Sequence, residues 1–303
     1  MEKQLAPLLI FTYNRLDTLE QVFKYLKNNS LCKETELFVF SDFARQEKDI
    51  EAVNRVRKYL RTVNGFKSIT IIERQENYGL AKNIIEGVTE IINKYGKVIV
   101  LEDDLITSPN FLVYMNQALN FYENSNNIFA ISGYTGKLPS LSQLENDVYL
   151  SYRPSSWGWG TWKDQWENID WDVVDFDEFI KDRKQVKKFN RGGIDMARML
   201  RHCMEGENHS WAIRWSYAMS KQDKYCIYPK VSKIQNIGFG KGATNCTGID
   251  IYQTTLDTSN QMDFKFEKDI QIDKQLTKEF RYVFSYTNKL FKRINNYIRK
   301  IKK

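Results

Sequence analysis

The sequence predicts an α/β protein with a mostly parallel central sheet flanked by helices. Two observations predict this fold class. Short apolar runs typical of strands alternate with amphipathic segments of helical period through the first hundred residues, which is the order of βαβ units. Each apolar run also ends abruptly in polar residues, and ligands of parallel sheets bind at the carboxyl ends of the strands.

The elements follow from these patterns in chain order. Strands are expected where apolar residues stand together, at residues 7–12, 36–41, 68–72 and 97–101. Helices are expected where apolar residues recur every three or four positions, as Leu19, Val22 and Phe23 do with Leu26. They are predicted at residues 17–28, 48–63, 81–95 and 109–122, the last opening at Pro109, which a helix start tolerates.

Length and composition allow one large domain or two smaller ones. The chain has 303 residues, of which 42% are hydrophobic, and this is ample for a sizeable core. We expect one domain at residues 1–255, with halves at 1–105 and 106–255, and a C-terminal extension at 256–303. The formal net charge of +7 suits an anionic partner such as a nucleotide phosphate or a membrane surface.

No export signal or membrane-spanning segment is recognisable in the sequence. Residues 1–6 are polar, and no run of about 18 apolar residues occurs. The four cysteines show no CxxC pairing, and with only two histidines a zinc site is not expected. These observations predict a cytoplasmic protein with free thiols.

The acidic run Glu102-Asp103-Asp104 directly follows the apolar run at 97–101. Adjacent carboxylates repel one another, and a divalent cation such as Mn²⁺ or Mg²⁺ would explain their place at a strand end. The alternative is a solvated acidic turn before a helix. Polar residues at the other strand ends, namely Tyr13-Asn14-Arg15, Asp42 and Asn77, are expected to meet the acids at one edge of the sheet. Neither GxGxxG nor GxxxxGK[ST] is present.

The second half of the chain is rich in aromatic residues. All seven tryptophans lie between residues 157 and 215. We expect residues 155–162 to form a mobile aromatic loop, with about half of the tryptophans facing a ligand and the others filling a second small core. Trp162, Trp166 and the helical segment 176–189 are expected to be structural. A strand is predicted at 227–237, followed by the glycine-rich residues 238–242, where Lys241 could help to hold a phosphate or the loop could be a plain turn.

The last twenty residues combine a recurring apolar pattern with many lysines and arginines. A basic amphipathic helix at 284–303 is typical of an anionic membrane surface, and the alternative is a helix packed on the domain. Residues 257–278 are expected to be a connector. With this segment the protein could be peripheral at the inner face of the plasma membrane.

Four motifs resemble those of GT-A glycosyltransferases. They are Thr12-Tyr-Asn-Arg15, Asn77-Tyr-Gly-Leu-Ala-Lys-Asn83, Val100-Leu-Glu-Asp-Asp-Leu105 with Ser108-Pro-Asn-Phe111, and Ser210-Trp-Ala-Ile-Arg-Trp215. Over residues 7–250 the chain resembles bacterial family-2-type sugar transferases of O-antigen and capsular polysaccharide synthesis. It is more distantly similar to the N-acetylglucosaminyltransferase I group, which also carries Glu-Asp-Asp.

The resemblance implies a GT-A fold that binds a nucleotide-sugar donor, most commonly a UDP-sugar. Asp104 would hold Mn²⁺ or Mg²⁺ at the donor diphosphate, Asp103 would lie near the ribose or sugar, and Glu102 would hold sugar hydroxyls. The donor pocket would be lined by Thr12, Asn14 and Arg15, with Asp42 near the base and Asn77, Leu80 and Lys82 as the opposite wall. The acceptor side would include Trp157, Trp159, Trp211 and Arg214.

An inverting transfer needs a base that takes a proton from the acceptor hydroxyl. In the Golgi relatives an Asp follows the Trp that matches Trp211, but here Ala212 follows. Glu205, Glu207 and His209 are the nearest candidate bases, and we favour Glu207 or His209, although each could be an ordinary surface residue. The base therefore stays open at this point.

The predicted function is metal-dependent transfer of a sugar to a glycan or lipid-linked acceptor in cell-surface polysaccharide synthesis. The alternatives are a non-catalytic carbohydrate-binding protein on the same scaffold and a nucleotidyltransferase that makes sugar nucleotides. The second alternative usually needs a glycine-rich N-terminal loop, which residues 10–15 lack. We expect no nucleic-acid partner, because the positive charge gathers in the C-terminal tail and no recognition motif is present.

Overall fold

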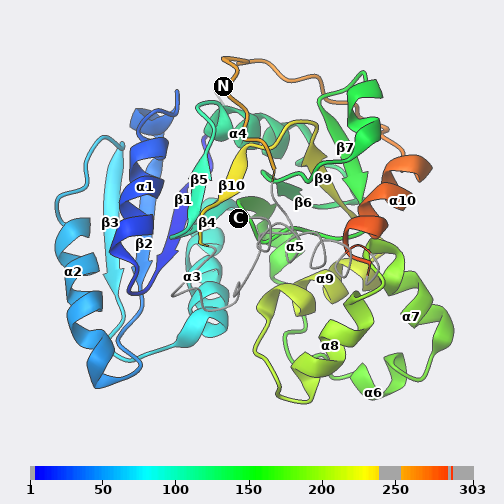
Figure 1. Ribbon diagram of the computed structural model, residues 1–303, viewed down its shortest axis with the longest axis horizontal. Helices are drawn as coiled ribbons and strands as arrows, with labels where there is room; N and C mark the ends of the chain where they lie inside the picture. Colours follow the sequence, from blue (N-terminus) through cyan, green and yellow to red (C-terminus); the bar gives the residue numbers. More distant parts are fainter. Residues whose placement is uncertain (1–3, 239–253, 286–287, 289–303) are drawn as a thin grey trace, which may run out of the picture.

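The computed structural model describes residues 4–238, 254–285 and 288. Its main feature is an eight-stranded mixed sheet in the order β3-β2-β1-β4-β8-β6-β9-β7, with a separate two-stranded ribbon of β10 and β5 (Figure 1). Four of its strand pairs are parallel: β1 with β2, β1 with β4, β2 with β3 and β6 with β9. The predicted α/β class with a mostly parallel sheet is confirmed.

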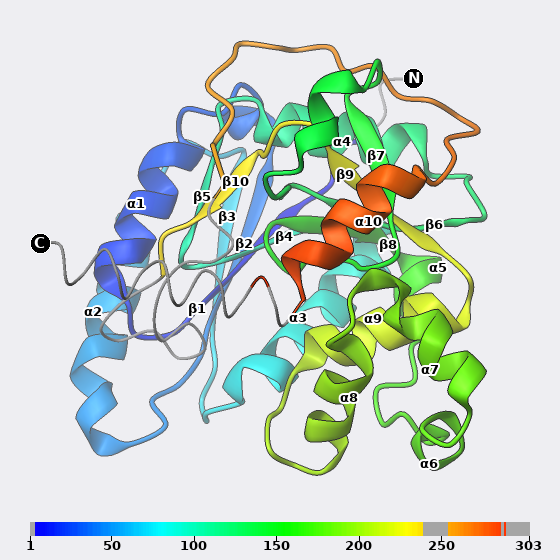
Figure 2. The same cartoon turned by 45° about the vertical axis from the view of Figure 1, so that its right-hand side comes forward.

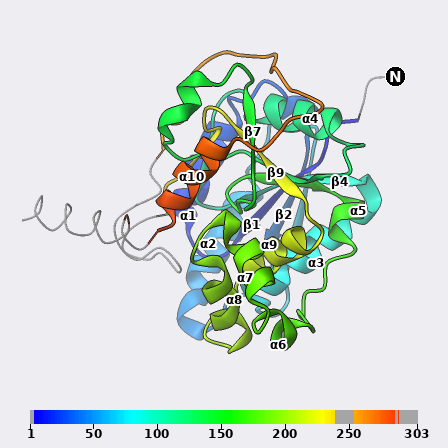
Figure 3. The same cartoon turned by 90° about the vertical axis from the view of Figure 1, so that its right-hand side faces the viewer.

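The first half of the chain forms the predicted alternation. Its elements are β1 (Leu8–Thr12), α1 (Leu16–Leu26), the short 3₁₀ helix η1 (Cys32–Glu34), β2 (Glu36–Ser41), η2 (Glu47–Asp49), α2 (Ile50–Leu60), β3 (Ser68–Glu73), α3 (Gly79–Tyr95) and β4 (Lys97–Glu102). In Figure 3, α1 and α2 lie on one side of these strands and α3 on the other. This arrangement follows from right-handed crossovers, because the chain moves outward from β1 to β3 and then returns to β4.

The helices form because one stripe of each is apolar and is buried against the sheet. The predicted stripe of α1, which includes Leu19, Val22 and Phe23, is fully buried. The helix α3 ends where Gly96 adopts a left-handed conformation with φ of 77°. The last predicted helix of this region, α4, starts at Phe111 rather than at Pro109, and it is buried almost all round.

The second half inserts an antiparallel strand into the sheet. Its elements are β5 (Leu105–Thr107), α4 (Phe111–Phe121), β6 (Ile128–Ser132), η3 (Pro139–Gln143), β7 (Val148–Ser151), β8 (Trp159–Trp162), α5 (Lys163–Trp166), α6 (Phe176–Phe179), α7 (Arg183–Phe189), η4 (Asn190–Gly192), α8 (Met196–Met204), α9 (Trp211–Lys221), β9 (Tyr225–Pro229) and β10 (Ile234–Asn236). Because β8 is antiparallel to both β4 and β6, β6 runs in the direction of β4, and β9 runs with β6.

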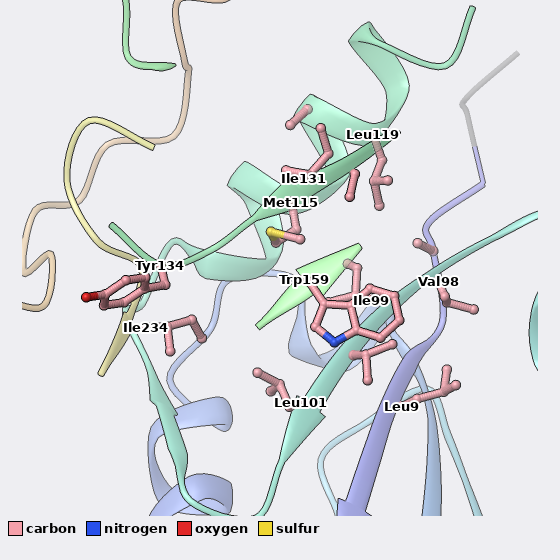
Figure 4. Packing of buried hydrophobic residues seen from close by; sticks show 14 of the residues in the cluster. Leu9, Val98, Ile99, Leu101, Met115, Leu119, Ile131, Tyr134, Trp159 and Ile234 are labelled. Atoms are coloured by element: carbon pink, nitrogen blue, oxygen red, sulfur yellow. The ribbon is translucent and has the colours of Figure 1, made fainter. Parts of the chain in front are cut away.

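The prediction of a mobile aromatic loop at 155–162 is wrong for its second half. Trp159 begins β8, is 1% exposed and packs on the rings of Trp211 and Trp215. Figure 4 shows its indole among the aliphatic side chains of the main core. Five tryptophans are buried, and Trp157 and Trp171 are half-buried. The pattern of glycines between aromatics therefore reflects close packing here, since a Cβ at Gly160 would collide with the main chain of β4.

The helices α6 to α9 form a lobe beside the sheet with a small core of its own (Figure 1). Phe179, Phe189 and Tyr217 pack their rings on one another at its centre. The buried tryptophans belong to the main core instead, so the expectation that they fill a second small core is wrong. The helical prediction for 176–189 is confirmed by α6 and α7.

Residues 257–283 pack against the sheet domain rather than forming a loose connector. Figure 2 shows this segment in orange passing over α4, where the ring of Phe264 packs on Tyr114. The segment leads into α10 (Lys274–Val283), which Asp273 caps through the Leu276 amide. Leu276 and Phe280 of α10 are buried in the main core. The predicted strand at 227–237 is divided into β9 and β10.

Several predictions fall outside the described residues. They are the glycine-rich loop beyond Gly238 with Lys241, and the amphipathic helix at 284–303 apart from Phe284, Ser285 and Asn288. Within the described chain, no helix is long and apolar enough to cross a membrane. Cys32, Cys203 and Cys226 are free thiols, as expected.

Candidate active site

The carboxyl ends of β1 and β4 bring the first motif and the acidic run together. The Asp103 carboxylate accepts hydrogen bonds from the Thr12 hydroxyl and the Tyr13 amide, both at 3.1 Å, and it pairs with the Arg15 guanidinium. Asp103 is buried, so its charge depends on these three donors. The predicted convergence of strand ends is confirmed for this part of the edge.

Asp104 shares Arg15 with Asp103, with 2.9 Å between its Oδ2 and the same guanidinium nitrogen, Nη2. The Asp104 carbonyl accepts a hydrogen bond from the Ile237 amide, so the residues that follow β10 lie beside the acidic run. A Cβ at Gly238 would collide with the Asp104 carboxylate, and only glycine allows this close approach. The ribbon of β5 and β10 therefore brings Gly238 against the candidate metal ligand.

Among the described residues, three carboxylates of this cluster face one cation, Arg15. Glu102 makes no hydrogen bond or ion pair with another described side chain. Burial, followed by the Asp104 and Asp103 charges, raises the pKa of Glu102 to about 8. Burial also raises the pKa of Asp104 despite Arg15. Burial alone would lower the pKa of Arg15, but Asp103 and Asp104 raise it. With all three carboxylates ionised, Arg15 leaves two negative charges uncompensated among the described residues, and a divalent cation would neutralise them. The donor set therefore fits Mn²⁺ or Mg²⁺.

The ends of β2 and β3 form a second polar cluster around Asp42. Its Oδ1 accepts the Phe43 and Tyr78 amides at 2.9 and 2.8 Å, and its Oδ2 accepts the Gly79 amide at 2.9 Å and the Asn77 side chain at 3.2 Å. Gly79 has a φ of +68°, which favours glycine at this turn. Asp42, which directly follows β2, therefore caps the N-terminus of α3. Four protein donors fill the Asp42 carboxylate in this structure, and they fix the start of α3 against the end of β2.

Sequence reasoning missed Arg57, and it placed Tyr13 at the strand end without the partners of its hydroxyl. The Tyr13 hydroxyl donates to Asp49 at 3.0 Å and accepts the Arg45 amide at 2.8 Å, which links the loops after β1 and β2. Arg57 lies buried on α2 and donates to the Arg74 carbonyl at 2.7 Å, close to the ends of β2 and β3. A charged residue inside the apolar stripe of α2 was the available signal for Arg57, whereas nothing in the sequence indicated Asp49 or Arg45 as partners of the Tyr13 hydroxyl.

The remaining predicted wall residues are accessible. Leu80 is 43% exposed at the start of α3, which is unusual for a large apolar side chain. The Lys82 ammonium lies 3.9 Å from the centre of the Tyr78 ring, near Glu76 and Glu86. Asn14 is half-buried and has no hydrogen-bond partner among the described residues. Their roles in donor binding stay predictions.

On the expected acceptor side, only one of the named tryptophans is accessible. Trp157 is half-buried, and its ring packs edge-on against Tyr134 with 4.9 Å between centroids. Trp159 and Trp211 are 1% and 3% exposed, so their assignment to an acceptor surface is wrong. Large indoles of this kind stabilise the core instead. Arg214 donates to the Trp171 carbonyl at 2.9 Å, which gives it a structural partner.

The two candidate bases lie in the loop between α8 and α9, and both are exposed. Glu207 contacts the ring of His202, while His209 has no partner among the described residues. His202, Glu205 and Glu207 are close enough together to share a cation, but they lie on the surface. No hydrogen bond or ion pair between described residues joins this loop to the acidic cluster.

Comparisons with known proteins agree with this geometry. The family model for glycosyl transferase family 2 matches residues 8–176. Similar solved structures include the mannosyltransferase PcManGT of Pyrobaculum calidifontis in complex with GDP-Man and Mn²⁺, with 10% identity, a TM-score of 0.41 and coverage of 73% of this chain and 70% of that one. They also include S. aureus TarS 1-349, with 14% identity, a TM-score of 0.34 and coverage of 60% and 53%.

No curated protein sequence matches this chain. The family match covers more than half of the chain, including β1 to β4 with the whole acidic cluster and both polar strand-end motifs. The predicted GT-A type of α/β fold is confirmed. The chain belongs to glycosyl transferase family 2 and is a glycosyltransferase that takes its sugar from a nucleotide-sugar donor.

Proposed function

We propose that this glycosyltransferase depends on a divalent metal, Mn²⁺ or Mg²⁺, and transfers its sugar with inversion. The observation that carries the proposal is the charge imbalance of Glu102, Asp103 and Asp104 against Arg15 at the end of β4. Asp104 would be the protein ligand of the metal, because it is more exposed than Asp103 and makes fewer hydrogen bonds within the protein. When bound, the metal would offset the negative charge that develops on the leaving diphosphate.

The protein's own groups would position the donor. Arg15 lies beside the proposed metal ligand Asp104. Its guanidinium would donate hydrogen bonds to phosphate oxygens of the donor diphosphate. The Asn14 side chain at the same strand end has no hydrogen-bond partner within the described part of the chain, and Asp103 is held in place by Thr12 and Tyr13. Asn77, Leu80 and Lys82 would form the opposite wall, and Asp42 holds that wall by capping α3. The donor is most simply a UDP-sugar, as the resemblance implies.

The acceptor is proposed to be a glycan or a lipid-linked sugar of cell-surface polysaccharide synthesis. Glu207 or His209 would take the proton from its hydroxyl. Of the two, His209 has no partner among the described residues, whereas Glu207 contacts His202. The exposure of the α8–α9 loop means that either residue would have to approach the donor when substrates bind.

A peripheral place on the inner face of the plasma membrane is proposed from the sequence of residues 284–303. Seven lysines and arginines among these residues would attract acidic lipids at about 1 kcal/mol each near the surface. Removing residues 289–303 should weaken association with anionic vesicles and leave nucleotide binding unchanged. Unchanged vesicle binding would contradict the membrane role.

Calorimetric titration of UDP, GDP and CDP, with and without Mn²⁺, tests the proposal directly. We expect one nucleotide to bind much more tightly when the metal is present, and Asp104→Asn to remove this difference. Equal binding with and without Mn²⁺ would contradict the metal dependence. Failure of all three nucleotides to bind the folded protein would contradict the assignment of the donor site.

A further inference from the structure

A groove of about 450 Å³ lies outside the acidic cluster and is not used by the proposed donor site. It is lined by residues 135–141, which follow β6, by 230–232, which follow β9, and by 254–255. Its volume falls within the range of ordinary small-molecule sites. The three segments are joined at its base, where the Ser232 hydroxyl accepts the Thr135 amide and Thr254 donates to the Thr135 carbonyl.

The groove opens at the same edge of the sheet as the acidic cluster. Because β6 and β9 run in the direction of β4, their carboxyl ends share that edge, allowing for the twist of the sheet. Gly238, which lies against Asp104, follows six positions after Ser232 in the groove, across β10 and its flanks. An extended chain of that length spans at most about 20 Å, so a short oligosaccharide could reach from one to the other.

Packed side chains at this edge of the sheet extend from the end of β4 to the groove. A Cβ at Gly158 would touch both Leu101 of β4 and Ile234 of β10, so the chain between Trp157 and β8 lies next to the end of β4. Figure 4 shows Ile234 between Leu101 and Tyr134. Trp157 packs on Tyr134, and the next residue, Thr135, lines the groove. The half-buried Trp157 thus packs beside the start of the groove lining, and its chain neighbour Gly158 lies against Leu101, one residue before Glu102. An indole at this place could stack on a sugar ring.

The charged side chains that are described in the lining of the groove are positive. Among the described residues that line it, Lys137 and Lys230 are the charged ones, and none is acidic. Lys230 donates one hydrogen bond to the Leu144 carbonyl at 2.6 Å, which leaves two of its three donors for a ligand. Lys137 is exposed and has no partner among the described residues. Val231 is 45% exposed and, with Pro139, adds an apolar wall.

We propose that this groove binds a negatively charged sugar residue of the acceptor glycan, several sugars away from the hydroxyl that reacts. The two lysines would hold its phosphate or carboxylate group, and the apolar wall would cover a face of its ring. This inference rests on the proposed function, because it extends the acceptor of that reaction. It makes the acceptor an anionic polysaccharide and gives the groove a role in choosing it.

The test uses three probes in calorimetry with the full chain: a galacturonic acid tetramer, maltotetraose that carries a 6-phosphate group, and neutral maltotetraose. We expect one of the two anionic probes to bind and the neutral one not to bind, and the probe that binds identifies carboxylate or phosphate as the recognised group. Lys137→Gln with Lys230→Gln should weaken this binding about fivefold, since exposed charge pairs contribute modestly. High salt should weaken it further.

Lys58→Gln with Lys94→Gln is the matched control, because it removes the same charge from α2 and α3. A further variant, Val231→Glu, places a negative charge on the exposed wall and should also weaken binding without disturbing the core. If neither anionic probe binds, or if the control pair weakens binding equally, the inference is wrong. Metal-dependent nucleotide binding by each variant separates this failure from failure of the donor site, because neither lysine belongs to that site.

Discussion

The Arg15 guanidinium lies 2.9 Å from the Asp104 carboxylate and also contacts Asp103, so one cation spans two of the three acids that follow β4. Arg15 therefore pairs with the same carboxylates that a divalent metal would bind. When metal and donor bind, we expect Arg15 to turn from Asp104 towards the diphosphate, because the metal would repel the guanidinium. The same residue would then oppose metal binding and favour donor binding.

Arg15→Met should bind Mn²⁺ more tightly than the unchanged protein when no nucleotide is present. Removal of a positive charge next to two carboxylates favours a cation, and about tenfold is expected from a partly screened interaction at this distance. Nucleotide binding should become weaker in the same variant. Titration of Mn²⁺ followed by electron paramagnetic resonance measures the first effect, and Arg45→Met, an exposed arginine, is the control. Weaker Mn²⁺ binding in Arg15→Met would contradict the competition.

Asp104→Asn should reduce metal-dependent sugar transfer by about a hundredfold or more, because it removes a charged metal ligand. The fold should remain intact, since Asp104 lies at a strand end and its neighbours carry the same charge. Thermal unfolding should therefore change by only a few degrees. Asp263→Asn, at an exposed position, serves as the control. Transfer at the normal rate in Asp104→Asn would exclude Asp104 as the metal ligand.

Asp42→Asn should destabilise the protein by about 1–3 kcal/mol, because the new amide group cannot accept all four hydrogen bonds that the carboxylate accepts. The start of α3 would lose its cap, and nucleotide affinity should fall with it. Urea unfolding measures the first effect and calorimetry the second. Asp17→Asn, at an exposed site on α1, should change neither. Weaker nucleotide binding with unchanged stability would point to direct contact between Asp42 and the base.

Trp159→Ala and Trp157→Ala form a pair that separates core from surface. Trp159→Ala should lower the free energy of unfolding by about 3–5 kcal/mol, because it leaves a cavity among buried rings. Trp157→Ala should cost much less stability and reduce transfer to the acceptor more than nucleotide binding. Urea unfolding and transfer assays with varied acceptor concentration check the pair. Equal destabilisation by both substitutions would show that Trp157 is also a core residue.

Asp257→Asn should destabilise the protein at neutral pH by about 3 kcal/mol, because it leaves the buried Lys233 without its partner. Burial alone would raise the pKa of Asp257, but hydrogen bonds from Lys233, Ser259 and Asn110 hold it below its usual value. A lowered pKa in the folded state stabilises the protein above the unfolded pKa of about 4 and ceases to do so as the pH falls further. The cost of the substitution should therefore shrink in acid. Urea unfolding at several pH values measures it, and a cost that grows in acid would contradict the ion pair.

The first hundred residues could be predicted because their signals are local. An apolar run bounded by polar residues predicts a strand, and a stripe such as Leu19, Val22 and Phe23 predicts a buried helix face. Both depend only on neighbours in the chain and on the periods of the two structures. The carboxyl-end rule then placed Arg15 and Asp103 at one edge without coordinates, because parallel strands end together.

The second half resisted prediction because its interactions are distant in sequence. Glycines between aromatics around Trp159 read as a flexible loop, but β8 lies between β4 and β6 and needs small residues to pack there. Residues 257–278 are polar on average, and contacts distant in sequence, such as Phe264 on Tyr114 and Phe266 on Phe121, show that they cover α4.

The amino-acid pattern alone therefore established the α/β class, the acidic edge of the sheet and the kind of chemistry that edge supports, because periodicity and charge are properties of neighbouring residues. The tertiary structure was needed to show that Arg15 spans Asp103 and Asp104, that Asp42 caps α3, and that Trp159 is core while Trp157 is accessible. Each of these depends on which segments meet in space. The packing of the whole core determines these contacts between distant segments, and no short stretch of the sequence encodes them.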